Sequence, residues 1–334
     1  MKKVLFATTA LIATAGVAAA EVKFSGYGRF GLGYQEDRTG TVSTVSGAAA
    51  TGVDTDNTIL VSRFRLNIDG IVETDGGVRF EGRVRLQADE DSGNGEANAA
   101  GLNGARFSVI FGGLRVDAGN VAGSFDNLAN YYGNEPGLEN FIGQYSGVDY
   151  DFLGYSSTGS GANAVFFQYS VGDFAFGASY DQRTFADTAV AGSPTSDGDR
   201  WDISATYTFN NITAALAYGQ TDVPGADKES LTVLTLGAEF GDFSGTLFVA
   251  DDDVNDDATN GTAYGFSAAY NVGAALTLTA AYGDGSGDGD TQQWGIGGIY
   301  DLGGGASLRG GIGQSKAGDA DSVLRADFGA QFNF

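Results

Sequence analysis

The sequence of 334 residues contains no cysteine and no histidine. Without cysteine, the fold cannot depend on disulfide bonds. Without histidine, the chain lacks the commonest general base, the Ser-His-Asp triad and the usual zinc ligand sets. Glycine loops of the phosphate-binding and dinucleotide-binding kinds, set between a strand and a helix, are also absent. These absences argue against most classes of enzyme and leave a pair of carboxylates as the remaining catalytic arrangement.

Positive charge is scarce, because 18 Lys and Arg stand against 42 Asp and Glu and give a formal net charge of -24. Phosphates would repel such an acidic chain, so we expect no nucleic-acid partner. Long apolar runs are missing too, which excludes membrane-spanning helices but not a membrane barrel, where only alternate residues meet lipid. The 54 glycines come with 23 Phe and 15 Tyr, an aromatic content unlike that of a disordered chain.

The N-terminus, MKKVLFATTALIATAGVAAA, joins two lysines to an apolar run that ends in small residues. This pattern predicts a secretory signal peptide over residues 1–20, cleaved before Glu21. A transmembrane anchor is the alternative, but the run is short and rich in Ala and Thr. We therefore expect an exported chain whose residues 21–334 form a single domain.

A two-residue alternation of apolar and polar side chains recurs from residue 22 to the C-terminus, and no helical period persists. The alternation predicts β-strands with one apolar and one polar face, mostly long enough to cross a membrane at a tilt. Sixteen segments fit it: 22–35, 58–69, 78–89, 104–112, 113–119, 162–171, 173–183, 200–209, 211–220, 230–240, 242–250, 262–270, 274–283, 291–301, 305–314 and 323–334.

Short turns and longer polar segments alternate between these strands, and the longest polar segment covers 120–161. This asymmetry is typical of an outer-membrane barrel. Aromatic residues stand just before the short turns, where an interfacial girdle would lie. They are Phe111, Phe209, Phe240, Tyr270 and Tyr300, and the chain itself ends on Phe334. A soluble β-sandwich is the alternative, but it would have fewer and less regular strands.

Arginines gather on the polar faces of the first five predicted strands. In VRFEGRVRLQAD (78–89), Arg79, Arg83 and Arg85 alternate with apolar residues. An arginine facing lipid near the membrane midplane costs roughly 2–4 kcal/mol, so these side chains should point into the lumen. The same argument places five further arginines there: Arg29, Arg63, Arg65, Arg106 and Arg115. Asp69 and Glu81 lie on the same faces and should balance part of this charge.

The segment 120–161 carries opposing charge in Asp126, Glu135, Glu139, Asp149 and Asp151. A loop of this length without regular structure usually has a function. If it folds into the barrel, its acids face the arginines across a narrow opening. A strong transverse field would then act on ions and dipolar solutes.

The whole chain after residue 20 resembles the general bacterial outer-membrane porins, in particular the alphaproteobacterial, Rhodobacter-like Gram-negative porins. The resemblance rests on EVKFSGYGRFGLGY after the cleavage site, on FGGLRVDAGNVAGSFDNLANYY and on the QFNF end. It implies an all-β, 16-stranded antiparallel transmembrane β-barrel whose long third loop, 120–161, folds inward to form a constriction. It also implies that loop acids face basic wall residues there: Asp126, Glu135 and Glu139 opposite Arg29, Arg63, Arg65, Arg83 and Arg85, with Asp117 near the base of the loop as a further acid.

The resemblance implies a channel in the bacterial outer membrane for passive, size-limited diffusion of ions and small hydrophilic solutes, with no enzymatic activity and no cofactor. The implied partners are outer-membrane lipid and lipopolysaccharide, two further copies in a homotrimer, and the barrel-assembly machinery, which recognises Phe334. Gly26 and Gly28 face outward and would permit close packing of subunits. The acidic total favours a mild cation preference, which the arginines oppose locally.

Two alternatives stay open. A substrate-selective channel on the same scaffold would need a feature such as an aromatic track, to which Tyr27, Tyr131, Tyr132 and Tyr145 could contribute. The segments ADDDVNDDAT (250–259) and GDGSGDGD (283–290) resemble calcium-binding runs. A secreted calcium-binding β protein would stack such runs at a nine-residue period, which is absent. Calcium on these loops is compatible with either class, and the sequence assigns no metal ligands.

Overall fold

The computed structural model describes residues 20–43, 49–90, 97–185, 196–223 and 225–334. Residues 1–19 of the predicted signal peptide lie outside this part, so the peptide stays a prediction. In the described residues, no helix is long and apolar enough to cross a membrane.

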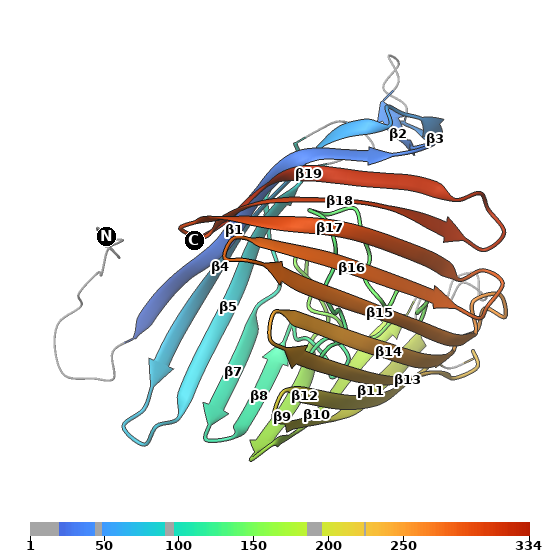
Figure 1. The fold of residues 1–334 in the computed structure, drawn as a ribbon. Coiled ribbons are helices and arrows are strands. Elements are labelled where there is room, and N and C mark those ends of the chain that lie inside the picture. Colours follow the sequence, from blue (N-terminus) through green and yellow to red (C-terminus); the bar gives the residue numbers. More distant parts are fainter. Residues whose placement is uncertain (1–19, 44–48, 91–96, 186–195, 224) are drawn as a thin grey trace.

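Sixteen of the described strands form one closed antiparallel barrel, which confirms the predicted fold class. The ring closes at β1 (Glu21–Gln35), which pairs with both β4 (Thr58–Glu73) and β19 (Val323–Asn333) (Figure 1). The other members follow in chain order: β5 (Arg79–Asp89), β7 (Arg106–Phe111), β8 (Leu114–Gly119), β9 (Ala164–Val171), β10 (Phe174–Phe185), β11 (Ser196–Phe209), β12 (Ile212–Asp222), β13 (Glu229–Phe240), β14 (Phe243–Asp253), β15 (Gly261–Val272), β16 (Leu276–Gly285), β17 (Thr291–Gly303) and β18 (Ala306–Ala317).

Each predicted segment overlaps one barrel strand, and the differences are confined to the strand ends. Three further strands fall in segments that the alternation assigned to connections. β2 (Thr39–Ser43) and β3 (Ala49–Asp54) form a hairpin beyond the barrel rim (Figure 1), and β6 (Gly101–Leu102) adds a short pairing to β5. β2 and β3 lie outside the barrel sheet and β6 is only two residues long, so the apolar alternation of a barrel strand does not identify them.

The aromatic residues before the short turns lie on the outer face, as the girdle prediction requires. Phe240 pairs with Phe243 across its turn, and Phe243 pairs in turn with Tyr270 on the next strand. All three side chains are exposed on the isolated chain, at 45–58%. Such a row of rings at one rim marks the boundary between hydrocarbon and headgroups.

The C-terminus completes the ring. Phe334 exchanges two backbone hydrogen bonds with Gly26, at 2.9 and 3.0 Å, and its ring stacks on Phe64 with centroids 5.7 Å apart. The ring of Phe332 covers Gly28 so closely that a β-carbon there would collide with it. The outward space over Gly28 is therefore filled by the ring of Phe332, and the packing of another subunit on Gly26 and Gly28 stays a prediction.

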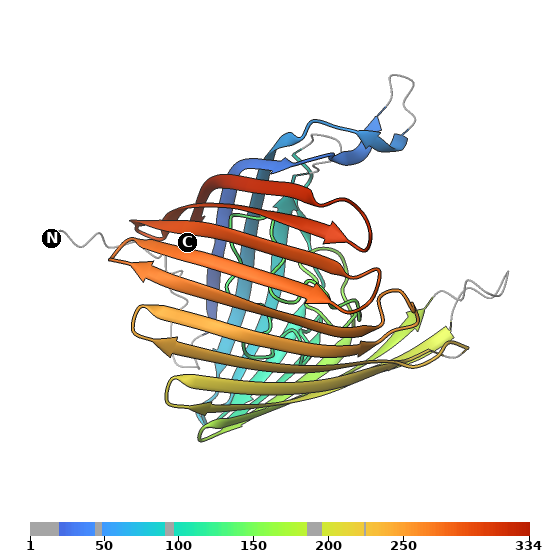
Figure 2. The same ribbon diagram turned by 45° about the vertical axis from the view of Figure 1, so that its right-hand side comes forward.

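The packed core lies between the long loop and the inner wall. Residues 120–163 connect β8 to β9 inside the barrel (Figure 2). Phe125, Leu128, Tyr131 and Tyr150 of this loop are buried against small and apolar residues of β12–β15. Those wall residues are Ala215, Ala217, Leu231, Val233, Phe248, Ala250 and Ala263. The prediction that the third loop folds inward is confirmed.

Candidate functional site

Glycines on the inner wall let the loop approach the strands. A β-carbon on Gly295 or Gly311 would lie 2.7 or 2.9 Å from the ring of Phe141, and one on Gly265 would collide with the Gln144 carbonyl. These distances are shorter than real β-carbon contacts, so the loop can lie this close only where the wall has no side chains. The high glycine content of the sequence is the sign of this close approach, but the sequence did not show which glycines contact the loop.

Buried carboxylates of the wall accept backbone N–H groups of the loop. Asp327 of β19 receives three such bonds, from Leu138 to Oδ1 at 2.9 Å and from Glu139 and Asn140 to Oδ2 at 2.7 and 2.8 Å. Asp202 of β11 and Asp252 of β14 do the same for Ser124 and Asp149, each at 2.8 Å. A carboxylate that accepts several N–H groups fixes a turn firmly, since bonds to charged acceptors are the stronger ones.

These anchors bring Glu139 against the arginines. Its Oε1 lies 2.6 Å from Arg29 Nη2 and 3.5 Å from Arg63 Nη2, and Arg29 also donates to the Leu138 carbonyl at 3.1 Å. Arg63 makes a second ion pair, to Asp89 of β5. The structure thus brings together three of the predicted residues, one from the loop and two from the wall.

Most other predicted arginines have carboxylate partners on their own wall. Arg83 donates to both oxygens of Asp69, at 2.5 and 3.1 Å, and Arg79 lies 2.5 Å from Glu81. Arg115 and Arg106 share Asp117, at 2.7 and 4.0 Å. Asp117 belongs to β8 and is buried, so it acts as a counter-ion within the wall, on the side opposite the loop acids. Asp69 and Glu81 balance charge as expected.

Arg65 and Arg85 have no carboxylate partner among the described residues. Arg65 donates to Gln87 at 2.5 Å, and Arg85 to Asn67 at 2.8 Å. Both reach Ser157 Oγ on the returning part of the loop, at 3.3 and 2.7 Å. Their guanidinium groups also stand over aromatic rings, Arg65 over Tyr27 at 5.1 Å and Arg85 over Tyr155 at 4.5 Å. Neutral partners hold the two side chains in place and leave their positive charge uncompensated.

The other loop acids are held by tyrosines. Asp126 accepts a bond from Tyr132 at 2.5 Å, and Glu135 accepts one from Tyr145 at 2.8 Å. The rings of Tyr132 and Tyr145 pack edge to face, 5.2 Å apart. Burial and these carboxylates raise the pKa of both phenols, so they remain donors.

Burial also raises the pKa of Glu135 and Glu139, and attraction to Arg29 opposes the shift in both. The acidic side of the lumen is therefore more easily protonated than free carboxylates would be. Asp149 and Asp151 do not join it, since Asp149 bonds to Asp252 and Asp151 lies 3.5 Å from Arg200, both on the β11–β14 side.

Several lumenal arginines were missed in the sequence, among them Arg200, which donates to the Asp151 carbonyl of the loop at 2.9 Å. Arg309 of β18 donates to Ser307 at 3.2 Å, and Arg325 of β19 donates to Ser315 at 2.7 Å. Both occupy inward positions of the same alternation that identified the others. The alternation marked both positions as inward. Only the closure of the ring, which sets β18 and β19 beside β1, shows that these arginines lie next to the predicted ones.

A closed barrel of sixteen strands, with an inward loop and a charged lumen, defines a transmembrane channel. The chain belongs to the Gram-negative porin family, whose family model matches residues 7–320. It is similar to the curated porin of Fuscovulum blasticum, with 31% identity over 323 residues that cover 94% of this chain and 100% of the relative. It is also similar to the porin of Rhodobacter capsulatus, with 28% identity over 340 residues and the same coverage.

Solved structures agree. A triple mutant of the Rhodopseudomonas blastica porin matches with a TM-score of 0.75 at 28% identity, covering 94% of this chain and 100% of that chain. Another mutant of the Rh. blastica porin matches with a TM-score of 0.74 at 29% identity and the same coverage. The protein is therefore an outer-membrane channel for the diffusion of small solutes, as predicted. The substrate-selective and secreted calcium-binding alternatives are not favoured.

Proposed function

We propose that solutes pass the loop through an opening lined by arginines of β1, β4, β5 and β7 on one side and by loop acids on the other. Glu139 carries this proposal, because a loop carboxylate within 2.6 Å of Arg29 ties the third loop to the basic wall. The residues that we assign to the basic side are Arg29, Arg63, Arg65, Arg83, Arg85 and Arg106. Those on the acidic side are Asp126, Glu135 and Glu139.

Arg79 and Arg115 belong to the mouth of the pore in this proposal. Each follows a short turn closely, at the start of β5 and β8, and each is paired with an acid of its own strand. Arg65 and Arg85 instead supply the uncompensated charge that acts on a passing ion. Such fixed charges select ions by sign and favour hydrophilic over apolar solutes.

The test is the reversal potential in a salt gradient across a planar bilayer. Removing one charge about 4 Å from the ion path is worth about 1 kcal/mol in water, roughly fivefold in local ion concentration before salt screening. Arg85→Ala should shift the reversal potential toward cation preference, and the cation-to-anion permeability ratio calculated from it should rise by up to about fivefold. Arg79→Ala removes an equal charge at the mouth and should shift it much less. Equal shifts in the two variants would mean that the path does not narrow at Arg85.

The remaining partners are also proposals. Trimer formation and contact with lipopolysaccharide are supported by the family to which the chain belongs. We also propose that the barrel-assembly machinery recognises Phe334, whose backbone pairs with Gly26 where the ring closes. Export by a signal peptide over 1–20 is supported by its sequence pattern.

We further propose that conduction involves no catalysis and needs no cofactor. Among the described residues, no group of three or more acidic, His or Cys side chains is placed to hold a metal ion. Calcium bound to the acidic segments 250–259 and 283–290 would lie away from the arginines. Addition of a calcium chelator should therefore leave single-channel conductance unchanged, and a fall in conductance would contradict this proposal.

A further inference from the structure

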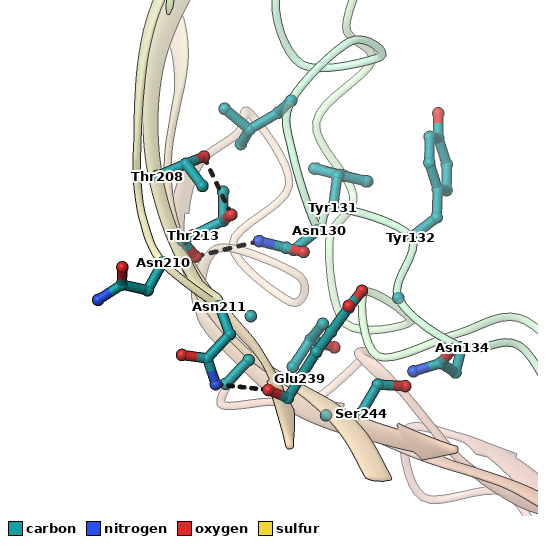
Figure 3. A pocket seen from close by; sticks show the side chains of 16 residues that line it. Asn130, Tyr131, Tyr132, Asn134, Thr208, Asn210, Asn211, Thr213, Glu239 and Ser244 are labelled. Atoms are coloured by element: carbon teal, nitrogen blue, oxygen red, sulfur yellow. Dashed lines mark hydrogen bonds between the residues drawn. The ribbon is translucent and has the colours of Figure 1, made fainter. Parts of the chain in front are cut away.

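A pocket of about 580 Å³ lies between the loop and the short-turn end of the inner wall. Loop residues from Leu128 to Asn134 form one side, and the ends of β11–β14 form the other (Figure 3). Its volume falls within the roughly 300–1,000 Å³ typical of small-molecule sites. The pocket is separate from the arginines of the proposed constriction, none of which lines it.

The lining divides into groups that bond to one another and groups that remain available. Thr208 and Thr213 share a hydrogen bond at 3.1 Å, and Asn130 donates to the Thr213 carbonyl at 3.2 Å. These contacts fix the floor of the pocket. A β-carbon on Gly237 would also collide with the Asn130 side chain, so the wall lacks a side chain there to admit the loop.

Among the lining side chains that make no hydrogen bond within the described part of the chain, three come from facing elements. Asn134 comes from the loop, and Glu239 and Ser244 come from β13 and β14. In Figure 3, the carboxylate of Glu239 extends toward the loop, and Asn134 lies across from Ser244. An amide, a carboxylate and a hydroxyl thus meet around one space, two from the wall and one from the loop.

This set of groups matches a neutral, hydroxyl-rich solute. The amide both donates and accepts, the carboxylate accepts, and the hydroxyl does either, which suits the paired donors and acceptors of vicinal hydroxyls. Phosphates and carboxylates are disfavoured, because Glu239 would repel them and no Lys or Arg is among the lining residues. Tyr132 is also part of the lining and is 37% exposed, which offers a ring for the C–H face of a sugar.

We propose that this pocket is a saccharide-binding subsite on the periplasmic side of the loop. Short turns of outer-membrane barrels face the periplasm, so a solute meets the pocket after it has passed the arginines. The subsite goes beyond the diffusion function, which does not require any binding. Since it stands open to the lumen, its role is to hold sugars weakly and briefly below the narrow part of the pore.

The test is saturation-transfer-difference NMR of maltose with the full barrel in detergent, which does not depend on conduction. Maltose should show saturable binding to the unaltered protein. Asn134→Ala removes the amide that would bond to a sugar hydroxyl and should weaken binding about tenfold. Glu239→Gln keeps the shape but loses the charged acceptor and should weaken binding severalfold. Glu229→Gln, at the other end of β13 where Glu229 bonds to Asn255, is the matched control and should not change it.

Three results would each overturn the proposal. Absence of saturable maltose binding, or equal affinity in Asn134→Ala and the unaltered protein, would overturn the proposal. Tighter binding of tetramethylammonium than of maltose, lost in Glu239→Gln, would make the pocket a cation site and would also overturn it. A far-UV circular dichroism spectrum like that of the unaltered protein should show that the barrel is intact in both variants. None of these results bears on the proposed constriction, because neither Asn134 nor Glu239 belongs to it.

Discussion

Asp327→Asn is expected to loosen the loop where it meets the basic wall. The carboxylate of Asp327 accepts the backbone N–H groups of Leu138, Glu139 and Asn140 and is itself buried. Asparagine keeps one acceptor oxygen and replaces the other with an NH2 group. That group would face an N–H donor, so at least one of the three bonds is lost and the others become bonds between neutral groups.

The magnitude follows from the bond types. Hydrogen bonds to charged groups are worth about 1.5–3 kcal/mol each and those between neutral groups about 0.5–1.5 kcal/mol. Exchanging three bonds of the first kind for two of the second loses about 1.5–8 kcal/mol, and about 3 kcal/mol is a conservative value within that range. Because 1.4 kcal/mol is a factor of ten, the displaced state of this segment should become roughly a hundredfold more populated.

Single-channel recording measures this population as time spent in altered conductance levels, since displacement takes Glu139 away from Arg29. Asp327→Asn should show these levels far more often than the unaltered protein. Asp301→Asn is the matched control, because Asp301 accepts one backbone bond, from Gly303 at 2.8 Å, within a short turn away from the loop. If the open-channel current of Asp327→Asn is as quiet as that of the control, Asp327 does not hold the loop.

Two further predictions concern the wall and the loop acids. Gly311→Val places a side chain where a β-carbon would already lie 2.9 Å from Phe141, so overpacking should lower the free energy of unfolding by about 1–3 kcal/mol in thermal unfolding in detergent. Gly298→Val, where the nearest atom is 3.8 Å away, should unfold like the unaltered protein. Burial raises the pKa of Glu139, so its charge is present above that pKa and is lost as the pH falls through it, at a higher pH than for a free carboxylate. The reversal potential should shift toward anions over that range, and Glu139→Gln should show a smaller shift, whereas equal shifts would exclude Glu139 as a source.

The alternation of side chains predicted the barrel because membrane strands obey a local rule. Each outward residue meets lipid, so residues such as Phe80 and Val84 identify the face of β5 without knowledge of its neighbours. The rule does not apply to β2 and β3, which lie beyond the rim, and the sequence did not predict them. Strand ends were imprecise for the same reason, since the selection for apolar side chains stops at the membrane boundary.

The pairing of charges could be predicted only in part. Alternation alone placed Arg83 in the lumen and Asp69 on the same face, and their contact then follows from the register of β4 and β5. The loop was different, because its conformation depends on contacts with distant residues. Asp327 lies 189 positions beyond Leu138 in sequence, and no local pattern marks it as the anchor of the loop.

In the proposed function, current flows past Arg65 and Arg85 at the loop. Because the chain has no cysteine, Ser157→Cys would create a single thiol between these two arginines. The hydroxyl that it replaces lies 2.7 Å from Arg85. The measurement is single-channel current before and after a sulfonate-bearing methanethiosulfonate reagent is added. We expect a prompt fall in current that persists until a reductant is added, and that develops faster than with the ammonium-bearing reagent because the guanidinium groups attract the anion. A thiol that is modified without any change in current would contradict the proposed path.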